Sequence, residues 1–275
     1  AFAAHLEGMS YFIHVLIAVL FSVSGALAQS GMASFAEGPR PLSARPAPMA
    51  TGLMATGPVV VELFTSQACP YCPEADAFLQ ELSALEDVIA LSFPIDYWNF
   101  YGWSDTLAQP EHGDRQKAYR NRLSNRRLYT PQIVVQGAAE AHGGEKDNVR
   151  SAIQAARGAG SSHIQLERRG EELVISLPAA TIEDDATLWL APFSAGPVEV
   201  SIEGGENAGK TLHYTHVVKG LTEIGPWKGE PATMTLDCSA ASALCADANA
   251  GSARGFAIIA QDGPGGAIIA AGSTR

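Results

Sequence analysis

Residues 59–73 read VVVELFTSQACPYCP, and this stretch decides the fold that we expect for the chain. The valine-rich run is typical of a strand that is covered on both faces, and Pro73 favours the first turn of a helix. Unpaired N–H groups and the helix dipole stabilise a thiolate at a helix start. We therefore expect Cys69 to be the attacking sulfur and Cys72, one turn further, to resolve a mixed disulfide.

A C-x-x-C pair can have functions other than redox chemistry. Structural disulfides use this spacing, and so do zinc sites, but a zinc site needs a second pair at matching spacing. The other two cysteines, Cys238 and Cys245, lie further apart in a loop-like segment. A redox dithiol is therefore favoured at Cys69 and Cys72 over a structural disulfide or a metal site. For Cys238 and Cys245 we favour a structural disulfide, with a second redox pair as the alternative.

Length, charge and the first residues limit the class of protein. The chain has 275 residues, enough for two domains, and its net charge of -11 argues against nucleic acid and anionic membranes as partners. The apolar stretch 11–23, followed by Ala-Leu-Ala, predicts a signal peptide at residues 1–28, although no Lys or Arg precedes it. An uncleaved membrane anchor is the alternative. Export to the periplasm or the medium would favour disulfides. Residues 29–57, rich in Pro, Ala, Ser and Gly, predict a disordered linker.

Residues 58–160 predict an α/β domain. The first two strands are separated by a helix, so we expect them to be parallel with a right-handed crossover. Glu74 and Asp76 complement the dipole of that helix. We expect strands at 58–64, 88–95, 130–135 and 140–142, and helices from 73, at 110–127 and at 146–157.

Residues 161–275 show short alternating segments without a helical period, which predicts an all-β, sandwich-like domain. The expected strands are 163–167, 172–177, 187–193, 197–203, 211–218, 233–237, 256–261 and 267–271. Residues 204–211 fit the phosphate-loop pattern G-x-x-x-x-G-K-[ST], but the residues from Thr211 onward alternate as a strand does. A phosphate loop needs a helix there, so we expect no nucleotide to bind.

Three groups of side chains are candidates for the site. Glu62 is the only charge in the first strand, and it either accepts a proton from Cys72 or is satisfied by nearby donors. Aromatic and acidic residues after the second strand either form a substrate groove or, as we favour, seal the core. Basic residues of the second helix either bind glutathione carboxylates or, as we favour, form a solvated face. The second group is Asp96, Tyr97, Trp98, Tyr101 and Trp103, and the third is Arg115, Lys117, Arg120, Arg122, Arg126 and Arg127.

The order of elements, with C-x-x-C at the first helix and Thr130-Pro131 opening the third strand, resembles the thioredoxin fold. This resemblance implies that Pro131 is cis and faces the dithiol, that Thr130 pairs with the substrate backbone, and that Glu62 relays a proton, as an acidic residue near this place does in thioredoxins. The tetrapeptide CPYC is the same as in dithiol glutaredoxins. A closer resemblance is to exported, thioredoxin-like bacterial proteins of unassigned function. Their motifs correspond here to residues 62–76 (E-L-F-T-S-Q-x-C-x-x-C-P-x-A-D), 90–98 (A-L-S-F-x-x-D-Y-W), 129–132 (Y-T-P-Q) and 205–209 (G-E-N-x-G).

The expected activity is that of an exported thiol–disulfide oxidoreductase, which needs no bound cofactor. Its partners would be thiols or disulfides of proteins or small molecules, not nucleic acid or nucleotides, with membrane contact only through an uncleaved signal. Two alternatives stay open. One is a metal-delivery protein that binds copper with both thiols and a histidine such as His142. The other is a non-enzymatic interaction module with a structural disulfide.

Overall fold

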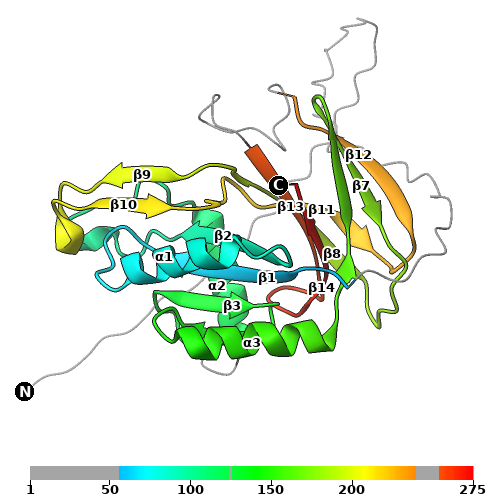
Figure 1. Cartoon of the computed structure of the whole chain (residues 1–275), viewed down its shortest axis with the longest axis horizontal. Helices are drawn as coiled ribbons and strands as arrows, with labels where there is room; N and C mark the ends of the chain where they lie inside the picture. Colours follow the sequence, from blue (N-terminus) through cyan, green and yellow to red (C-terminus); the bar gives the residue numbers. More distant parts are fainter. Residues whose placement is uncertain (1–55, 124–125, 240–253, 275) are drawn as a thin grey trace, which may run out of the picture. The chain divides into compact units, whose positions relative to one another are not determined.

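The computed structural model describes residues 56–123, 126–239 and 254–274, all within one compact unit that spans residues 42–275. Within this part the protein is a mixed α/β fold that is rich in strands (Figure 1). The signal peptide predicted at residues 1–28 lies outside the described residues, as does most of the linker predicted at 29–57. In the described part of the chain, no helix is long and apolar enough to cross a membrane.

A four-stranded sheet is built around the valine-rich strand and has the order β2-β1-β3-β4. The crossover helix α1 makes β1 and β2 parallel, as predicted, whereas β3 runs antiparallel to β1. The C-terminal ends of β1 and β2 and the start of β3 therefore lie at the same edge (Figure 1). The elements are β1 (Val59–Thr65), α1 (Cys72–Ser83), β2 (Val88–Pro94), β3 (Gln132–Val135) and β4 (Ala139–His142).

Helices cover both faces of this sheet, which explains why every residue of β1 and β2 is buried. On one face, α1 and α3 (Lys146–Ala159) pack on odd-numbered residues of β1 such as Leu63. On the other face, α2 (Pro110–Arg122) packs Tyr119 against Phe64. Continuous apolar runs such as β1 are what a doubly covered strand requires.

The second half of the chain forms two further sheets that pack face to face through one apolar cluster. A five-stranded sheet has the order β11-β8-β13-β14-β5, and a three-stranded sheet has the order β12-β7-β6. Alternate residues of β7 point into the cluster, as the sequence pattern predicts. The strands are β5 (Ser162–His163), β6 (Gln165–Arg169), β7 (Glu172–Leu177), β8 (Ala186–Ser194), β11 (Thr222–Trp227), β12 (Ala232–Asp237), β13 (Arg254–Gln261) and β14 (Ile268–Ser273).

The two halves of the chain share a core. Phe193 of β8 and Ile259 of β13 belong to the same buried cluster as Phe64 of β1. Gln136, in the turn after β3, accepts a hydrogen bond from Val60 N–H at 2.9 Å and donates to the Ile268 carbonyl at 2.6 Å. The outer face of the five-stranded sheet thus covers the part of the four-stranded sheet that α2 does not cover.

A separate hairpin of β9 (Val198–Ser201) and β10 (Thr211–Tyr214) runs alongside α1 (Figure 1). Between its strands, Gly205–Asn207 forms the short 3-10 helix η2. Thr211 begins a strand and not a helix, as predicted, so the glycine-rich segment before it does not have the structure of a phosphate loop.

Some boundaries differ from the predictions. α2 ends at Arg122, earlier than the predicted residue 127. β11 was not predicted, because Gly225 and Pro226 break its alternating pattern. The structure accommodates them in an edge strand that pairs only with β8 and shifts register between Glu223 and Gly225.

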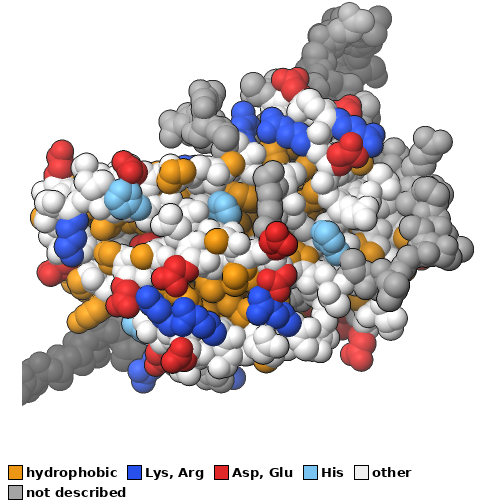
Figure 2. Space-filling model, in the orientation of Figure 1, with side chains coloured by type: hydrophobic (Ala, Val, Ile, Leu, Met, Phe, Trp, Pro, Cys, Tyr) orange, Lys and Arg blue, Asp and Glu red, His pale blue; other side chains and the backbone are white. Residues whose placement is uncertain are grey.

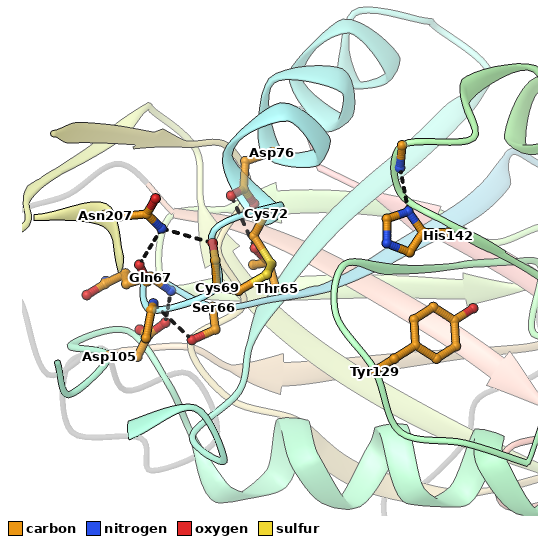
Figure 3. Close-up of a disulfide and its surroundings, with 12 residues drawn as sticks. Thr65, Ser66, Gln67, Cys69, Cys72, Asp76, Asp105, Tyr129, His142 and Asn207 are labelled. Carbon is orange, nitrogen blue, oxygen red and sulfur yellow. Dashed lines mark hydrogen bonds between the residues drawn. A yellow bond between two sulfur atoms is a disulfide. The ribbon is translucent and has the colours of Figure 1, made fainter. Parts of the chain in front are cut away.

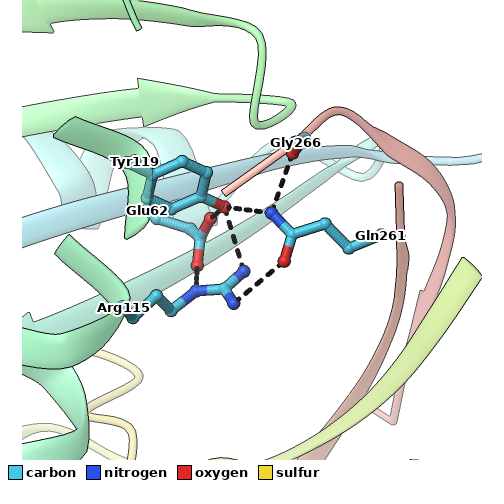
Figure 4. A network of polar contacts seen from close by, with 5 residues as sticks. All are labelled: Glu62, Arg115, Tyr119, Gln261 and Gly266. Carbon is cyan, nitrogen blue, oxygen red and sulfur yellow. Dashed lines mark hydrogen bonds and ion pairs between the residues drawn. The ribbon is translucent and has the colours of Figure 1, made fainter. Parts of the chain in front are cut away.

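A buried polar network ties β1 to α2 and β13 (Figure 4). The Glu62 carboxylate pairs with Arg115 Nε at 2.5 Å and accepts a hydrogen bond from the Tyr119 hydroxyl. Arg115 also donates to Gln261 Oε1 at 3.2 Å and to the Tyr119 hydroxyl at 3.0 Å. Burial raises the pKa of Tyr119 above its ordinary value, so the phenol keeps its proton and donates a hydrogen bond to Glu62.

We predict that Glu62→Ala lowers the free energy of unfolding by about 3–5 kcal/mol, because it leaves the Arg115 guanidinium buried without its counter-ion. Urea denaturation measures the change. Arg157→Ala is the matched control, since its ion pair with Asp87 is largely exposed and should contribute about 1 kcal/mol or less. A loss for Glu62→Ala no larger than that for the control would contradict the structural role of the network.

Candidate functional site

The structure places a disulfide between Cys69 and Cys72 at the C-terminal end of β1 (Figure 3). Cys69 lies in the turn after β1, where its N–H donates to the Ser66 carbonyl at 3.1 Å. Cys72 is the first residue of α1, and its N–H donates to the Cys69 carbonyl at 3.3 Å. The predicted order of strand, dithiol and helix is therefore observed, with the helix starting at Cys72 and not at Pro73.

The dithiol is enclosed, and within the turn that carries it (residues 66–72) Tyr71 alone is exposed. Both cysteines have 0% of their surface exposed, whereas Tyr71 between them is 69% exposed. An attacking thiolate has to reach a sulfur directly. Reaction at Cys69 therefore requires the surrounding loops to move.

Pro131 lies beside the helix that carries the disulfide. Its carbonyl accepts a hydrogen bond from Gly143 N–H at 2.9 Å. A Cβ atom on Gly143 would lie 2.6 Å from the Cβ of Ala75 in α1 and 2.9 Å from the Cβ of Pro131. Gly143 is thus the spacer that lets the Pro131 loop approach the first turn of α1. The Thr130–Pro131 peptide bond is cis, the geometry that the resemblance implies.

Thr130 faces inward in this structure. Its hydroxyl is buried and has no hydrogen-bond partner among the described residues. The Tyr97 phenol lies near it, and burial raises the pKa of Tyr97 to about 12, against smaller opposing effects of Gln116 and Thr130. On the surface next to Thr130, the rings of Tyr129 and His142 stack in parallel at 6.2 Å.

Asn207 fastens the dithiol turn to the β9–β10 hairpin. It is fully buried, and its side-chain amide donates to the carbonyls of Gln67 and Cys69, each at 2.9 Å (Figure 3). Lys210 donates to its oxygen at 2.9 Å. Asn207 is the asparagine of the G-E-N-x-G motif, so the structure gives this motif a role in holding the dithiol turn. Its position next to Cys69 depends on tertiary contacts that spacing along the chain does not show.

The loop after β2 supports the same turn from the other side. Trp103 Nε1 donates to Gln67 Oε1 at 2.8 Å, and the Asp105 carboxylate accepts from Gln67 N–H at 2.7 Å. Trp103 also packs on the apolar cluster of the hairpin, and Tyr97 and Trp98 pack on the main core. The core-sealing interpretation therefore describes these three aromatic residues, whereas Tyr101 remains exposed.

Asp76 is a buried carboxyl group next to Cys72. The two residues are one turn apart in α1, and side chains with this spacing lie on one face of a helix, with Cβ atoms about 5–6 Å apart. Thr65 Oγ1 donates to Asp76 Oδ2 at 3.1 Å (Figure 3). Burial raises the pKa of Asp76 well above its ordinary value, Thr65 opposes this effect, and Asp105 adds to it. The sequence had indicated only that Asp76 complements the helix dipole; its spacing from Cys72 was the available signal.

Glu62, the acid first considered for proton transfer, is held elsewhere. Its carboxylate is occupied by Arg115 and Tyr119 on the α2 side of the sheet, and the described contacts do not join it to either cysteine. Arg115 is also the exception to the solvated face expected of α2, because it is buried while Lys117 is exposed and Arg120 is half-buried.

The remaining predicted groups are the second cysteine pair, which lies partly outside the described residues, and His142, which lies in the surroundings of the disulfide (Figure 3). Cys238 is disulfide-bonded, and its predicted partner Cys245 falls in the stretch that is not described. His142, considered as a copper ligand, accepts a hydrogen bond from Gly144 N–H at 3.2 Å. Among the described residues, no group of three or more His, Cys, Asp or Glu side chains is placed to hold a metal ion.

We predict that Asn207→Ala lowers the free energy of unfolding by about 1–3 kcal/mol, because two buried carbonyls lose their donor. Reduction of the Cys69–Cys72 disulfide by dithiothreitol should also become faster, since the turn is no longer tethered. Urea denaturation and thiol release measure the two effects. Lys210→Met is the comparison: it removes only a donor to the oxygen of Asn207 and keeps both donors to the dithiol turn, so it should leave the rate of disulfide reduction unchanged. Equal behaviour of the two variants would show that the tether has no role.

Comparisons with known proteins find solved structures of similar fold and leave the activity open. A crystal structure of an Agrobacterium tumefaciens protein is 29% identical, with a TM-score of 0.66, over 80% of this chain and 95% of that one. HBP35 of Porphyromonas gingivalis is 15% identical, with a TM-score of 0.57 over 80% of this chain and 75% of that one, which is a likeness of fold alone.

A probable thioredoxin of Archaeoglobus fulgidus is 40% identical over 38 residues. That match covers 14% of this chain and 42% of the relative, so the chain spans about two fifths of its length. A far longer match comes from a protein-family model that covers residues 60–253. The chain therefore belongs to the family described as "Protein of unknown function (DUF1223)".

Proposed function

We propose that the protein carries out thiol–disulfide exchange at Cys69 and Cys72. The observation that carries this proposal is the disulfide that joins the turn after β1 to the first residue of α1. A helix start stabilises the thiolate that attacks or leaves, because its free N–H groups and dipole favour negative charge. The short likeness to a probable thioredoxin supports the same chemistry.

The same proposal includes the fold and the compartment. We assign residues 58–160 to a thioredoxin-like domain, supported by the crossover β1-α1-β2, the antiparallel β3 and the position of Pro131 against α1. The apolar stretch near the start of the chain supports export to an oxidising compartment, the periplasm or the medium. The dithiol then exchanges with thiols or disulfides that it meets there.

The exchange proceeds in two displacements. A substrate thiolate attacks Cys69 Sγ, the bond between the two cysteine sulfurs breaks, and Cys72 leaves as a thiolate that takes up a proton. A second substrate thiolate then attacks the substrate sulfur of the mixed disulfide and releases Cys69. The substrate is oxidised to a disulfide and the protein is reduced to a dithiol; in the reverse direction Cys69 attacks and Cys72 resolves.

Asp76 is the group that we assign to the proton of Cys72. It lies one turn along α1 from this residue, and its oxygen Oδ1 is buried without a hydrogen-bond partner among the described residues. Because burial raises its pKa, Asp76 holds a proton under conditions in which an exposed aspartate does not. It can therefore give a proton to the Cys72 thiolate as it leaves and take one from the thiol as it attacks.

We predict that Cys72→Ser accumulates a mixed disulfide through Cys69 with a model disulfide, because the Cys69 thiolate displaces one thiol from it and no resolving sulfur remains. Cys69→Ser should form none and should lose activity in a disulfide-reduction assay. Mass spectrometry under non-reducing conditions detects the adduct, and urea denaturation of each variant establishes that it is folded. A folded Cys69→Ser variant with unchanged activity would remove the proposal.

Asp76 makes the protein's stability depend on pH in a direction that can be tested. Its pKa is higher in the folded protein than in the unfolded chain, so the folded state binds the extra proton and stability falls as pH rises above about 4. Asp76→Asn should reduce this decline by up to about 1.4 kcal/mol per pH unit. It should also slow exchange by about 100-fold, the lower range for general acid–base catalysis.

Denaturation curves and exchange rates between pH 4 and pH 9 measure both effects of this substitution. Thr65→Val serves as the control, because it removes only the hydroxyl that donates to Asp76 and leaves the carboxyl group in place. Because the hydrogen bond from Thr65 lowers the pKa of Asp76, its loss should shift the pH profile of exchange toward higher pH without abolishing the activity. Exchange by Asp76→Asn at the wild-type rate at every pH would show that this carboxyl group is structural.

A further inference from the structure

Exposed aromatic side chains are concentrated around the dithiol. Among the described residues, the exposed large hydrophobic side chains are Phe100 (90% exposed), Tyr71 (69%), Tyr101 (60%) and Leu85 (39%). Tyr71 lies between the two cysteines, and Phe100 and Tyr101 belong to the 3-10 helix η1 (Asn99–Tyr101) in the loop after β2. We call Tyr71, Phe100 and Tyr101 the aromatic rim.

The loop that carries Phe100 and Tyr101 is fastened to the dithiol turn. Three residues further on, Trp103 donates to Gln67, two residues before Cys69. On its other side, a Cβ atom on Gly205 would lie 3.0 Å from the Tyr101 carbonyl, so η2 packs directly against this loop. η2 in turn carries Asn207, which binds the Cys69 carbonyl. The aromatic rim therefore lies on loops that are bonded to the reactive turn.

These side chains are exposed although the loop beneath them is well ordered by its own contacts. The Asn99 side chain accepts a hydrogen bond from Asp105 N–H at 2.9 Å, and the ring of Tyr101 lies 4.9 Å from the ring of Trp98. Exposed apolar residues that are held in place beside a site are typical of surfaces that bind a partner. Aromatic residues contribute most at such surfaces, because they bury a large area with few rotatable bonds.

The charges near the dithiol do not suit a small anionic thiol. Glu74 and Glu206 are exposed close to Cys72 and Asn207, and Figure 2 shows acidic, basic and hydrophobic side chains together at the end of the molecule that carries η2. The nearby cations are already engaged: Lys146 lies between Glu74 and Glu81, and Lys210 donates to Asn207. Because Glu74 is paired with Lys146 and Glu206 lies near Lys210, these side chains give no net attraction for the carboxylates of glutathione.

Two basic residues of α2 already have partners within the protein. Arg115 forms a buried ion pair with Glu62. Arg122 donates to the carbonyls of Pro264 and Asp262, in the turn between β13 and β14. The sequence suggested that basic residues of α2 could bind the carboxylates of glutathione. Arg115 and Arg122 already have other partners.

We infer that the substrate is a polypeptide whose cysteine is flanked by apolar side chains, which the aromatic rim binds, and that glutathione is a poor substrate. This inference rests on the proposed exchange activity and names its substrate class. The apolar side chains of the polypeptide would cover the rim while its sulfur approaches Cys69.

The test compares three thiols as reductants of the oxidised full-length chain. They are a peptide with cysteine between phenylalanine and leucine, the same peptide with serine at both flanking positions, and glutathione. Stopped-flow tryptophan fluorescence follows reduction, and mass spectrometry identifies the adduct on Cys69. The apolar peptide should react about tenfold or more faster than the serine peptide, as expected when one aromatic side chain is buried on binding.

The variant that tests the rim is Phe100→Ser with Tyr101→Ser. It should lose the preference for the apolar peptide and leave the rate with glutathione unchanged. Leu85→Ser is the matched control, because it removes the remaining exposed large hydrophobic side chain of the described residues. Leu85 follows α1 at the end away from Cys72, about 20 Å along the helix axis. This control should keep the full preference.

Each other outcome has a definite meaning. Exchange with all three thiols at similar rates, or an equal effect of Leu85→Ser, overturns the inference and leaves the proposed exchange standing. Rim-dependent sedimentation with neutral phospholipid vesicles, or a rim-dependent dimer in ultracentrifugation, without peptide preference overturns it in favour of another occupant. Absence of reduction of the Cys69–Cys72 disulfide by all three thiols and by dithiothreitol removes the proposed function itself.

Discussion

The hydrogen bonds from the Asn207 side chain to the carbonyls of Gln67 and Cys69 are the contact on which the site depends. A turn between a strand and a helix leaves backbone groups without partners, and a buried carbonyl without a donor is costly. Here the donor comes from a hairpin more than a hundred residues further along the chain. The geometry of the dithiol is therefore set by both halves of the protein.

Around that contact, two buried acids have separate tasks. Asp105 accepts hydrogen bonds from the backbone of Gln67 and Leu107 and so shapes the loops. Asp76 keeps one oxygen without a partner among the described residues, which leaves it able to exchange a proton. Glu62, by contrast, has its charge neutralised by Arg115. These three carboxyl groups show that burial alone does not define a proton donor; the number of committed hydrogen bonds decides.

Local patterns predicted most of the elements because the interactions behind them are local. The valines of β1 and the alternation in β7 follow directly from which faces are covered. Gly225 and Pro226 concealed β11, since an edge strand tolerates residues that a central strand does not. The dithiol was predictable from its spacing, whereas the role of Asn207 was not, because a glycine-rich turn gives no indication of which distant carbonyls it meets.

The core shared by the two halves has a consequence for how this protein could be divided or recombined. Val60, Phe64 and Phe93 pack against residues of β8 and β13, so a fragment that stopped at residue 160 would expose one side of its sheet to water. The same cut would remove Asn207. The segment with the dithiol is thus not expected to fold by itself. Moving it into another protein would require new strands in place of β8 and β13 to cover its sheet.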